Sequence, residues 1–279
     1  MKYYIVVLFL FFLSCNDNKE ITIRVSIDNT IQETTVDKDI TELVFRIGQF
    51  TTQNDIEGIS KLKRLRKLNI QMGGNYSDYS FLTQLRELEI LIMISCSIDN
   101  LNFLRNMDNL RILILSNSII YKNEINLQNN KNLKYLDITG LYFYNKDAFN
   151  SSITSMPPYV PNIINIPDSL EYLNIDRSLG IILSTELLTN LTKTPHVILG
   201  RMDIEYHKRE IKKNNKFNEV HKSYTDNWDY IQSHPNFILK DPEEMLPIEY
   251  QAETLLQDYL EKDISTNLKI VDESDKNTQ

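Results

Sequence analysis

The sequence predicts an α/β solenoid, in which short strands and irregular connecting segments stack into one elongated domain. Three observations lead to this fold class. A pattern of the form L-x-x-L-x-L recurs through the middle of the chain, its copies start about 23 residues apart, and the apolar positions recur in the same places within each copy. A fixed period of this length marks repeat architectures, because each unit can bury its apolar edge only against its neighbours.

The pattern has clear and weaker copies, whose starts are separated by 25, 23, 22, 23, 37 and 24 residues. The clear copies begin at Leu65, Leu88, Leu110, Leu133 and Leu170, and the weaker ones at Ile40 and Thr194. Early in each unit, an apolar spacing of three predicts a tight, 3₁₀-like segment on the convex side. The final L-x-L predicts a short strand whose alternate side chains face the core.

This arrangement resembles the leucine-rich repeat family, especially its short bacterial class of about 22 residues per repeat. The resemblance covers residues 37–204 and implies short parallel strands on a concave face. The family usually has Asn at the turn after the strand, where this chain has Gly73, Cys96, Ser118, Leu141, Ser178 and Met202. Only Cys96 is a usual substitute for this asparagine. We therefore expect the backbone groups of these turns to find other hydrogen-bond partners. We also expect Cys96 to be a buried structural residue.

The segments outside the regular repeats have different sequence patterns. Residues 15–36 are expected to form a linker and an N-terminal cap, in which the alternation from Ile21 to Ile27 predicts a strand that closes the stack. An insertion at about 145–163 contains Pro157, Pro158 and Pro161, and proline excludes helix and sheet interiors, so we expect a loop there.

The chain after the repeats is expected to be helical or mixed over residues 205–265, forming a cap on the last repeat or a small appendage. Within it, Pro247 to Asp263 carries apolar residues at helical spacing. These residues are Ile248, Ala252, Leu255, Leu256, Tyr259 and Leu260. Residues 266–279 are expected to be a flexible tail.

The N-terminal end of the chain predicts where in the cell the protein is located. After Lys2, an eleven-residue apolar run from Tyr3 to Leu13 is too short for a membrane-spanning helix, which takes about 20 residues, but it suits a secretory signal. Residues 1–14 with the following Cys15 resemble a bacterial lipoprotein signal, although Phe12 stands where that motif usually has Leu. The resemblance implies that Cys15 is acylated on sulfur and becomes the mature N-terminus. It therefore implies a lipid-anchored protein of the bacterial cell envelope, at the outer membrane or the cell surface. A cleaved signal with an incidental cysteine is the alternative.

Composition excludes several functions. The chain has 30 basic and 38 acidic residues, giving a net charge of −8, so it has no bulk attraction for nucleic acid. Two cysteines cannot build a disulfide scaffold. The four histidines lack metal-ligand spacing, and we predict no metal, cofactor or catalytic residue. The basic run from Lys61 to Lys67 is expected to be solvated on the convex surface.

The residues between the strand leucines are expected to form the concave face. Ile90, Ile92, Ile94, Ile112 and Ile114 fall there on two neighbouring strands, and Tyr135 and Tyr172 on the next two strands extend the patch. Exposing such a patch costs roughly 25 cal/mol per Å², and soluble proteins seldom do so without a function. We predict a protein- or peptide-binding face. Two alternatives stay open: the proline insertion or the C-terminal segment covers the patch, or the strand register is shifted. Asp137 and Asp176 are expected to be hydrogen-bonding surface groups on the same face.

The sequence therefore predicts a non-enzymatic, membrane-anchored module for protein–protein interaction. An envelope enzyme with a site near Trp228 and His234 is one alternative, and a purely structural envelope component is another. The C-terminal segment discriminates between them. A cleft with converging polar side chains would favour the enzyme, whereas a segment that only seals the last repeat would favour the binding module.

Overall fold

The computed structural model describes residues 19–27, 30–46, 58–71, 76–121, 124–143, 163–175, 181–199, 204–213 and 218–238. The predictions for the signal segment and Cys15, for most of the proline-containing insertion, and for residues 239–279 lie outside these ranges.

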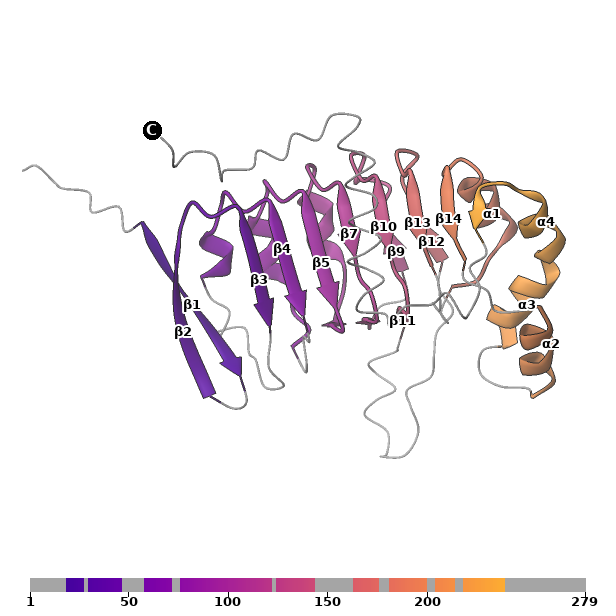
Figure 1. Cartoon of the computed structure of the whole chain (residues 1–279), viewed down its shortest axis with the longest axis horizontal. Coiled ribbons are helices and arrows are strands. Elements are labelled where there is room, and N and C mark those ends of the chain that lie inside the picture. The colour runs from indigo at the N-terminus through magenta and orange to yellow at the C-terminus, as the bar shows by residue number, and fades with distance from the viewer. Residues whose placement is uncertain are drawn as a thin grey trace, which may run out of the picture.

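An eight-stranded parallel sheet forms the spine of the molecule (Figure 1). Its strands, in spatial order, are β15 (Phe237–Ile238), β14 (His196–Ile198), β13 (Tyr172–Asn174), β10 (Tyr135–Asp137), β7 (Ile112–Ile114), β5 (Ile90–Ile94), β4 (Lys67–Gln71) and β3 (Glu42–Arg46). Every copy of the repeat pattern, including the two weaker ones, contributes one strand. The predicted parallel solenoid is confirmed.

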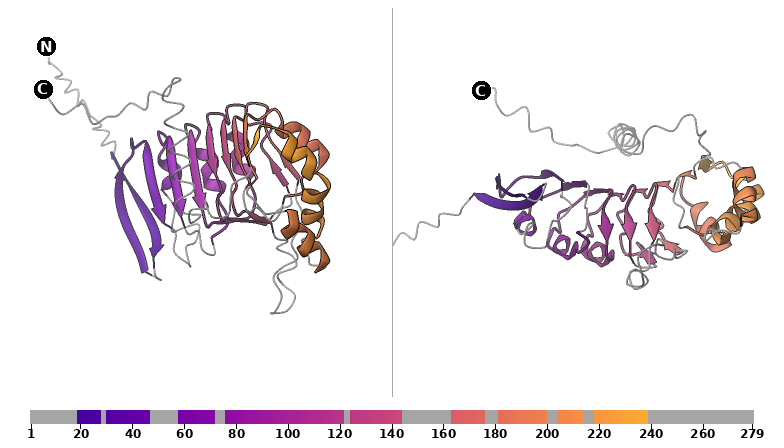
Figure 2. Two further views of the ribbon diagram at one scale, coloured as in Figure 1. Left: turned by 45° about the vertical axis from the view of Figure 1, so that its right-hand side comes forward. Right: turned by 90° about the horizontal axis from the view of Figure 1, so that it is seen from below.

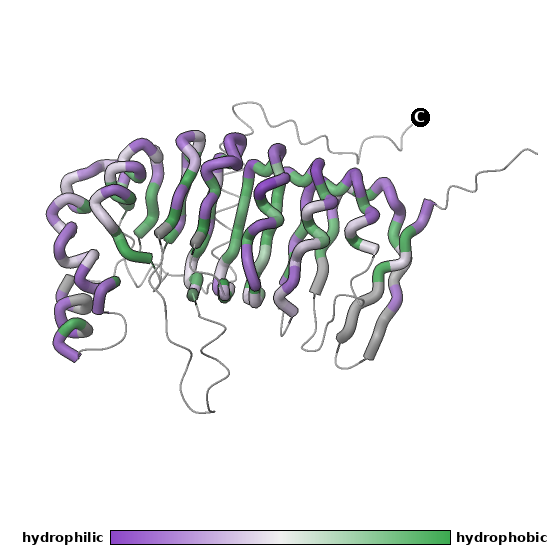
Figure 3. Tube along the Cα trace, turned by 180° about the vertical axis from the view of Figure 1, so that it is seen from behind, coloured by the Kyte–Doolittle hydropathy of each residue, from purple (hydrophilic) through white to green (hydrophobic). Residues whose placement is uncertain are grey.

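One row of side chains shows why the repeats stack. Leu68, Leu91, Leu113, Leu136 and Leu173 are aligned across neighbouring strands. Each is at most 1% exposed. Burying one leucine contributes about 1.5–3 kcal/mol, and a solenoid adds this contribution repeat by repeat. The strands accordingly carry the hydrophobic stretches of the chain (Figure 3).

The other side of each repeat consists of short helical turns and small strands (Figure 2). The 3₁₀ helices are η1 (Ile59–Lys61), η2 (Ser80–Gln84) and η3 (Asn102–Asn106). A three-stranded parallel sheet joins β6 (Ser97–Ile98), β8 (Ile119–Ile120) and β11 (Tyr142–Phe143), and β9 (Glu124–Asn126) pairs with β12 (Ile163–Asn165). The 3₁₀ turns confirm the sequence prediction, whereas the small sheets were not predicted.

The last repeat replaces the 3₁₀ turn with an α-helix, α1 (Thr185–Leu191). Ser184 caps this helix by accepting a hydrogen bond from the Leu187 N–H at 3.1 Å. A serine at this position satisfies a backbone donor that would otherwise lack a partner. The local cap therefore stabilises the start of α1.

The N-terminal end is closed by a hairpin. The predicted capping strand is β1 (Glu20–Ile27), and it pairs antiparallel with β2 (Thr30–Asp37), which the sequence analysis did not predict. Ile23 on β1 is 1% exposed and belongs to the main core. Gly58, just before η1, has φ of 113°, and its Cα approaches the Thr22 carbonyl so closely that a Cβ would lie 2.5 Å from that oxygen. Only glycine tolerates both conditions.

The C-terminal end is closed by helices α2 (Ile204–Lys212), α3 (Asn218–Asp226) and α4 (Trp228–Ser233), followed by β15. Val220, Tyr224, Ile231 and Phe237 are buried in the main core. Ser223 and Asn227 reach back to the preceding repeat: the Ser223 Oγ accepts from the Leu183 N–H at 3.0 Å, and the Asn227 amide donates to the Leu183 carbonyl at 3.0 Å. The described part of the segment therefore seals the last repeat.

Candidate interaction surface

The sheet has one face against the main core and one face turned away from it, which we call the concave face. Strand register assigns its side chains to rows that run across the sheet. The first row contains Glu42, Lys67, Ile90, Ile112, Tyr135, Tyr172 and His196, and the second contains Val44, Asn69, Ile92, Ile114, Asp137, Asn174 and Ile198. These rows agree with the predicted alternation, so the alternative of a shifted register is wrong.

The apolar residues of these rows form a hydrophobic cluster separate from the main core. It contains every residue predicted to bind a partner, and we call it the concave cluster: Ile90, Ile92, Ile94, Ile112, Ile114, Tyr135 and Tyr172. The chain therefore has an apolar assembly on each face of one sheet.

Exposure changes sharply along the concave face. In the second row Val44 is 65% exposed, whereas Ile92 is 5% exposed and Ile114 is 0% exposed. Ile90 and Tyr172 are half-buried and form the accessible margin of the concave cluster. The centre of the cluster is thus covered, in contrast to the free surface at Val44.

Two tyrosines of the cluster stack on each other. The rings of Tyr135 and Tyr172 stack with centroids 4.6 Å apart and planes 5° from parallel. His196, next in the row, lies 6.5 Å from the Tyr172 ring centroid at a tilt of 46°. Amphipathic rings at the edge of an apolar patch are typical of binding surfaces.

Asp137 corrects one sequence expectation. Its carboxylate lies in the second row, but it is 0% exposed and is not a surface group. It accepts hydrogen bonds from the Thr139 N–H at 2.9 Å, the Ser116 hydroxyl at 3.1 Å and the Asn174 amide at 3.1 Å. Burial raises the pKa of Asp137 and outweighs the hydrogen bonds, which lower it. Its predicted counterpart, Asp176, lies outside the described residues.

The turn after β5 shows how the missing asparagines are replaced. Ser118 accepts a hydrogen bond from the Cys96 N–H at 3.1 Å, and its hydroxyl lies 3.2 Å from both the Met93 and Ser116 carbonyl oxygens. The Cys96 thiol is directed at the Ile94 carbonyl, 3.5 Å away. Cys96 is 1% exposed, which confirms the expected structural role.

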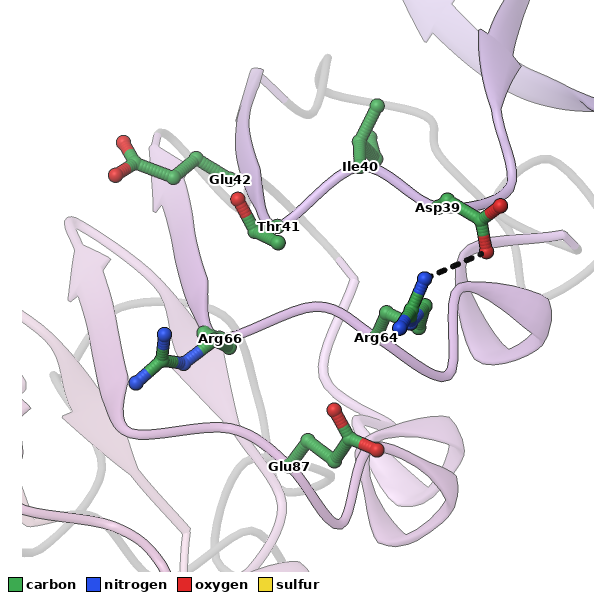
Figure 4. Close-up of a pocket in the computed structure, with 7 residues that line it drawn as sticks. All are labelled: Asp39, Ile40, Thr41, Glu42, Arg64, Arg66 and Glu87. Carbon is green, nitrogen blue, oxygen red and sulfur yellow. Dashed lines mark ion pairs between the residues drawn. The ribbon is translucent and has the colours of Figure 1, made fainter. Parts of the chain in front are cut away.

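A pocket of about 550 Å³ lies at the N-terminal ends of β3 and β4. The sequence did not predict it. The pocket is lined by Asp39, Ile40, Thr41, Glu42, Arg64, Arg66 and Glu87 (Figure 4). Arg64 is directed at Asp39, with 3.6 Å between Nη1 and Oδ1. The guanidinium of Arg66 donates through Nε to Glu89 at 2.8 Å.

The basic side chains of Lys61, Lys63, Arg64 and Arg66 are exposed, as expected, whereas Lys67 is half-buried and lies in the first row of the concave face. The alternation of charged residues with the repeat leucines is the sequence signal for these exposed arginines. Their acidic partners, Asp39 and Glu89, come from neighbouring repeats. Exposed ion pairs of this kind contribute about 0–1 kcal/mol each to stability.

The residues of the enzyme alternative have structural roles in the C-terminal cap. His234 follows α4, and its Nδ1 lies 2.9 Å from the Tyr230 carbonyl oxygen. Its ring lies 4.1 Å from the Tyr230 ring centroid. Trp228 begins α4 and is half-buried.

Within the described ranges, no three His, Cys, Asp or Glu side chains are grouped so that they could hold a metal ion. The described helices include none with the length and apolar composition needed to cross a membrane.

One strand per repeat, a buried leucine row and 3₁₀ turns behind the sheet define a leucine-rich-repeat solenoid. No protein-family model matches the sequence, and no curated protein matches it. Solved structures to which this chain is similar include an internalin (inlF) from Listeria monocytogenes, 22% identical with a TM-score of 0.33, covering 60% of this chain and 57% of the internalin. Internalin C2 of the same organism is 17% identical with a TM-score of 0.36, covering 60% of this chain and 75% of its own.

A plant protein is also similar. The leucine-rich-repeat ectodomain of the membrane receptor kinase GASSHO1/SCHENGEN3 from Arabidopsis thaliana, solved in complex with CASPARIAN STRIP INTEGRITY FACTOR 2, is 14% identical with a TM-score of 0.30. The match covers 60% of this chain and 19% of the receptor chain.

Proposed function

We propose that this protein is a non-enzymatic interaction scaffold that binds a protein or peptide ligand through its concave face. The observation that carries this proposal is the concave cluster itself, a second apolar assembly on the sheet face that the core does not use. Apolar and aromatic side chains at the centre of a patch, with a polar margin, are the usual composition of a binding surface.

The accessible margin gives the ligand its first contact. Ile90 and Tyr172 are half-buried at opposite sides of the cluster. Lys67 and Glu42 lie beside Ile90 in the same row and are joined by an ion pair of 3.2 Å. We expect tyrosine to contribute most, because tyrosine is enriched among the residues that dominate interface energy.

Photo-cross-linking in cells tests this function. Tyr172 is replaced by a photoreactive benzoylphenylalanine, and the matched control carries the same group at Arg105, an exposed residue of η3 behind the sheet. We expect a discrete adduct of defined mass from position 172 and none from position 105. Adducts of equal yield from both positions, or from neither, would contradict a ligand on the concave face.

The cellular location of the protein is part of the same proposal. We propose that Cys15 is acylated and anchors the protein in the bacterial cell envelope, because acyl chains replace a transmembrane span at about 0.8 kcal/mol per buried CH₂. Labelling with radioactive palmitate is expected in the unmodified chain and in Cys96→Ala, but not in Cys15→Ala. Label retained in Cys15→Ala would show that the acylated residue lies elsewhere, and no label in the unmodified chain would show that the anchor is absent.

A further inference from the structure

Asn69 has a buried amide that lacks a hydrogen-bond partner. It lies on β4, in the second row of the concave face, between Val44 of β3 and Ile92 of β5. Asn69 is 8% exposed, and its side-chain oxygen is enclosed and accepts no hydrogen bond from any residue that the structure describes. Buried polar groups normally find a partner, because leaving one unpaired is costly. No contact within the described part of the fold compensates for that cost.

A second asparagine of the same row shows the usual arrangement. Asn174, on β13, is 1% exposed, and its amide donates a hydrogen bond to the Asp137 carboxylate at 3.1 Å. This asparagine therefore has a structural role in the free protein. Asn69 instead holds an acceptor that the described chain does not use, on the face that is proposed to bind a ligand.

The surface beside Asn69 is open on one side. Val44 is 65% exposed, whereas Ile92, on the other side, is 5% exposed. β3 is the edge strand of the eight-stranded sheet, so no further strand of that sheet lies beyond Val44 (Figure 1). A ligand can therefore approach Asn69 over Val44 without entering the covered centre of the concave cluster.

We propose that Asn69 binds the backbone of an extended peptide and that Val44 contacts one apolar side chain of the same peptide. The proposal rests on the proposed function, because it names the chemistry of the ligand at that same face. It makes Asn69 a binding residue that is kept at the expense of the stability of the free protein.

An extended peptide is the ligand that matches both residues. The Asn69 amide carries an acceptor oxygen and a donor nitrogen, and each peptide group of a ligand offers one donor and one acceptor. A half-turn about the last side-chain bond exchanges the two ends of the amide without changing its shape, so both ends are usable by a ligand. Every second side chain of an extended peptide faces the same way. One apolar side chain can therefore cover Val44 while a neighbouring peptide group meets Asn69.

Unfolding of the full chain in urea tests whether Asn69 has a structural partner. Asn69→Leu replaces the amide with an apolar group of similar size, and Asn174→Leu makes the same change at the satisfied asparagine. We expect the equilibrium constant for unfolding to fall about fivefold or more in Asn69→Leu, which removes an unpaired buried group, and to rise by about fivefold or more in Asn174→Leu. A rise in Asn69→Leu as well would overturn the inference, because the fold would then depend on the amide.

Two small probes test binding. N-acetylvaline methylamide carries one apolar side chain between two peptide groups, and its fully N-methylated analogue keeps the side chain but has no N–H donor. The side-chain amide resonances of Asn69 are followed by NMR spectroscopy of the full chain and are assigned by their absence from Asn69→Leu.

We expect the Asn69 resonances to shift with increasing concentration of the first probe. The N-methylated analogue should bind about fivefold more weakly, because it cannot donate to the amide oxygen. The side-chain resonances of Asn174 should not move with either probe. Equal shifts of the Asn69 resonances with both probes, or no shift with either, would overturn the inference.

The proposed function fails separately from this inference. The adduct from position 172 is measured in the unmodified background and with Asn69→Leu, and we expect its yield to fall at least about fivefold in the variant. An equal yield in both would show a cellular ligand that does not use Asn69, and would overturn the inference while leaving the function. No adduct in the unmodified background, with Asn69 responding to the first probe alone, would contradict the proposed function and not the peptide site at Asn69.

Discussion

The ring of Tyr172 stacks on the ring of Tyr135 within 5° of parallel, although the two residues lie on strands separated by the largest spacing between repeats. The contact arises because β13 pairs directly with β10 and places the two tyrosines opposite each other. The long insertion between them therefore leaves the register of the sheet unchanged.

This stack should contribute measurably to stability. An aromatic pair adds about 0.5–1.5 kcal/mol beyond its buried area. We expect Tyr172→Leu and Tyr135→Leu to lower the free energy of unfolding in urea non-additively, with a coupling of that size in a double-mutant cycle. Tyr172→Phe, which keeps the ring, should retain the coupling. Strictly additive losses would show that the rings pack independently.

Ser118 should be essential to the turn it supports. Ser118→Ala leaves the Cys96 N–H without its acceptor in a buried site, and an unsatisfied buried donor costs about 1–3 kcal/mol. Ser80→Ala, at an exposed position in η2, is the matched control and should change the unfolding free energy by less than about 0.5 kcal/mol. Equal effects of the two changes would refute the role of Ser118 as the substitute for the usual asparagine.

Two glycines offer a comparison between steric and conformational strain. Both have positive φ, 113° at Gly58 and 63° at Gly140. A Cβ at Gly58 would lie 2.5 Å from the Thr22 carbonyl oxygen, whereas at Gly140 the nearest atom would be 3.6 Å away. We expect Gly140→Ala to cost about 1 kcal/mol, as for a left-handed residue, and Gly58→Ala to cost more. Thermal or urea unfolding measures both, and a smaller loss for Gly58→Ala would contradict the close approach of the hairpin.

Asp137 should make stability depend on pH. Burial raises its pKa above the ordinary value of 3.8, so the unfolded chain loses this proton first as the pH rises. The contribution of Asp137 to stability is therefore greatest below that value, and it declines until the pH passes the folded-state pKa. Asp137→Asn removes this decline. We expect the unfolding free energy of the variant, relative to the unmodified protein, to increase with pH above about 4. A difference that is constant across a pH series of urea titrations would refute the raised pKa.

Much of the fold followed from sequence alone. The positions of Leu68, Leu91 and Leu113 in the repeat fixed which strand residues face the core, and their neighbours Ile90 and Ile112 fell on the opposite face as predicted. The reason is physical: alternation of side chains along a strand is a local property, so a repeated apolar pattern determines both faces once the units stack.

Tertiary structure decided what the pattern could not. The Asp137 carboxylate became buried because Ser116, Thr139 and Asn174 come together from the strands of different repeats and the turns that follow them. Arg64 lines a pocket because Asp39 belongs to the preceding repeat. Ile114 on the central strand β7 is 0% exposed, whereas Val44 on the same face of the edge strand β3 is 65% exposed. Each of these outcomes is set by contacts between distant parts of the chain, and local periodicity carries no information about such contacts.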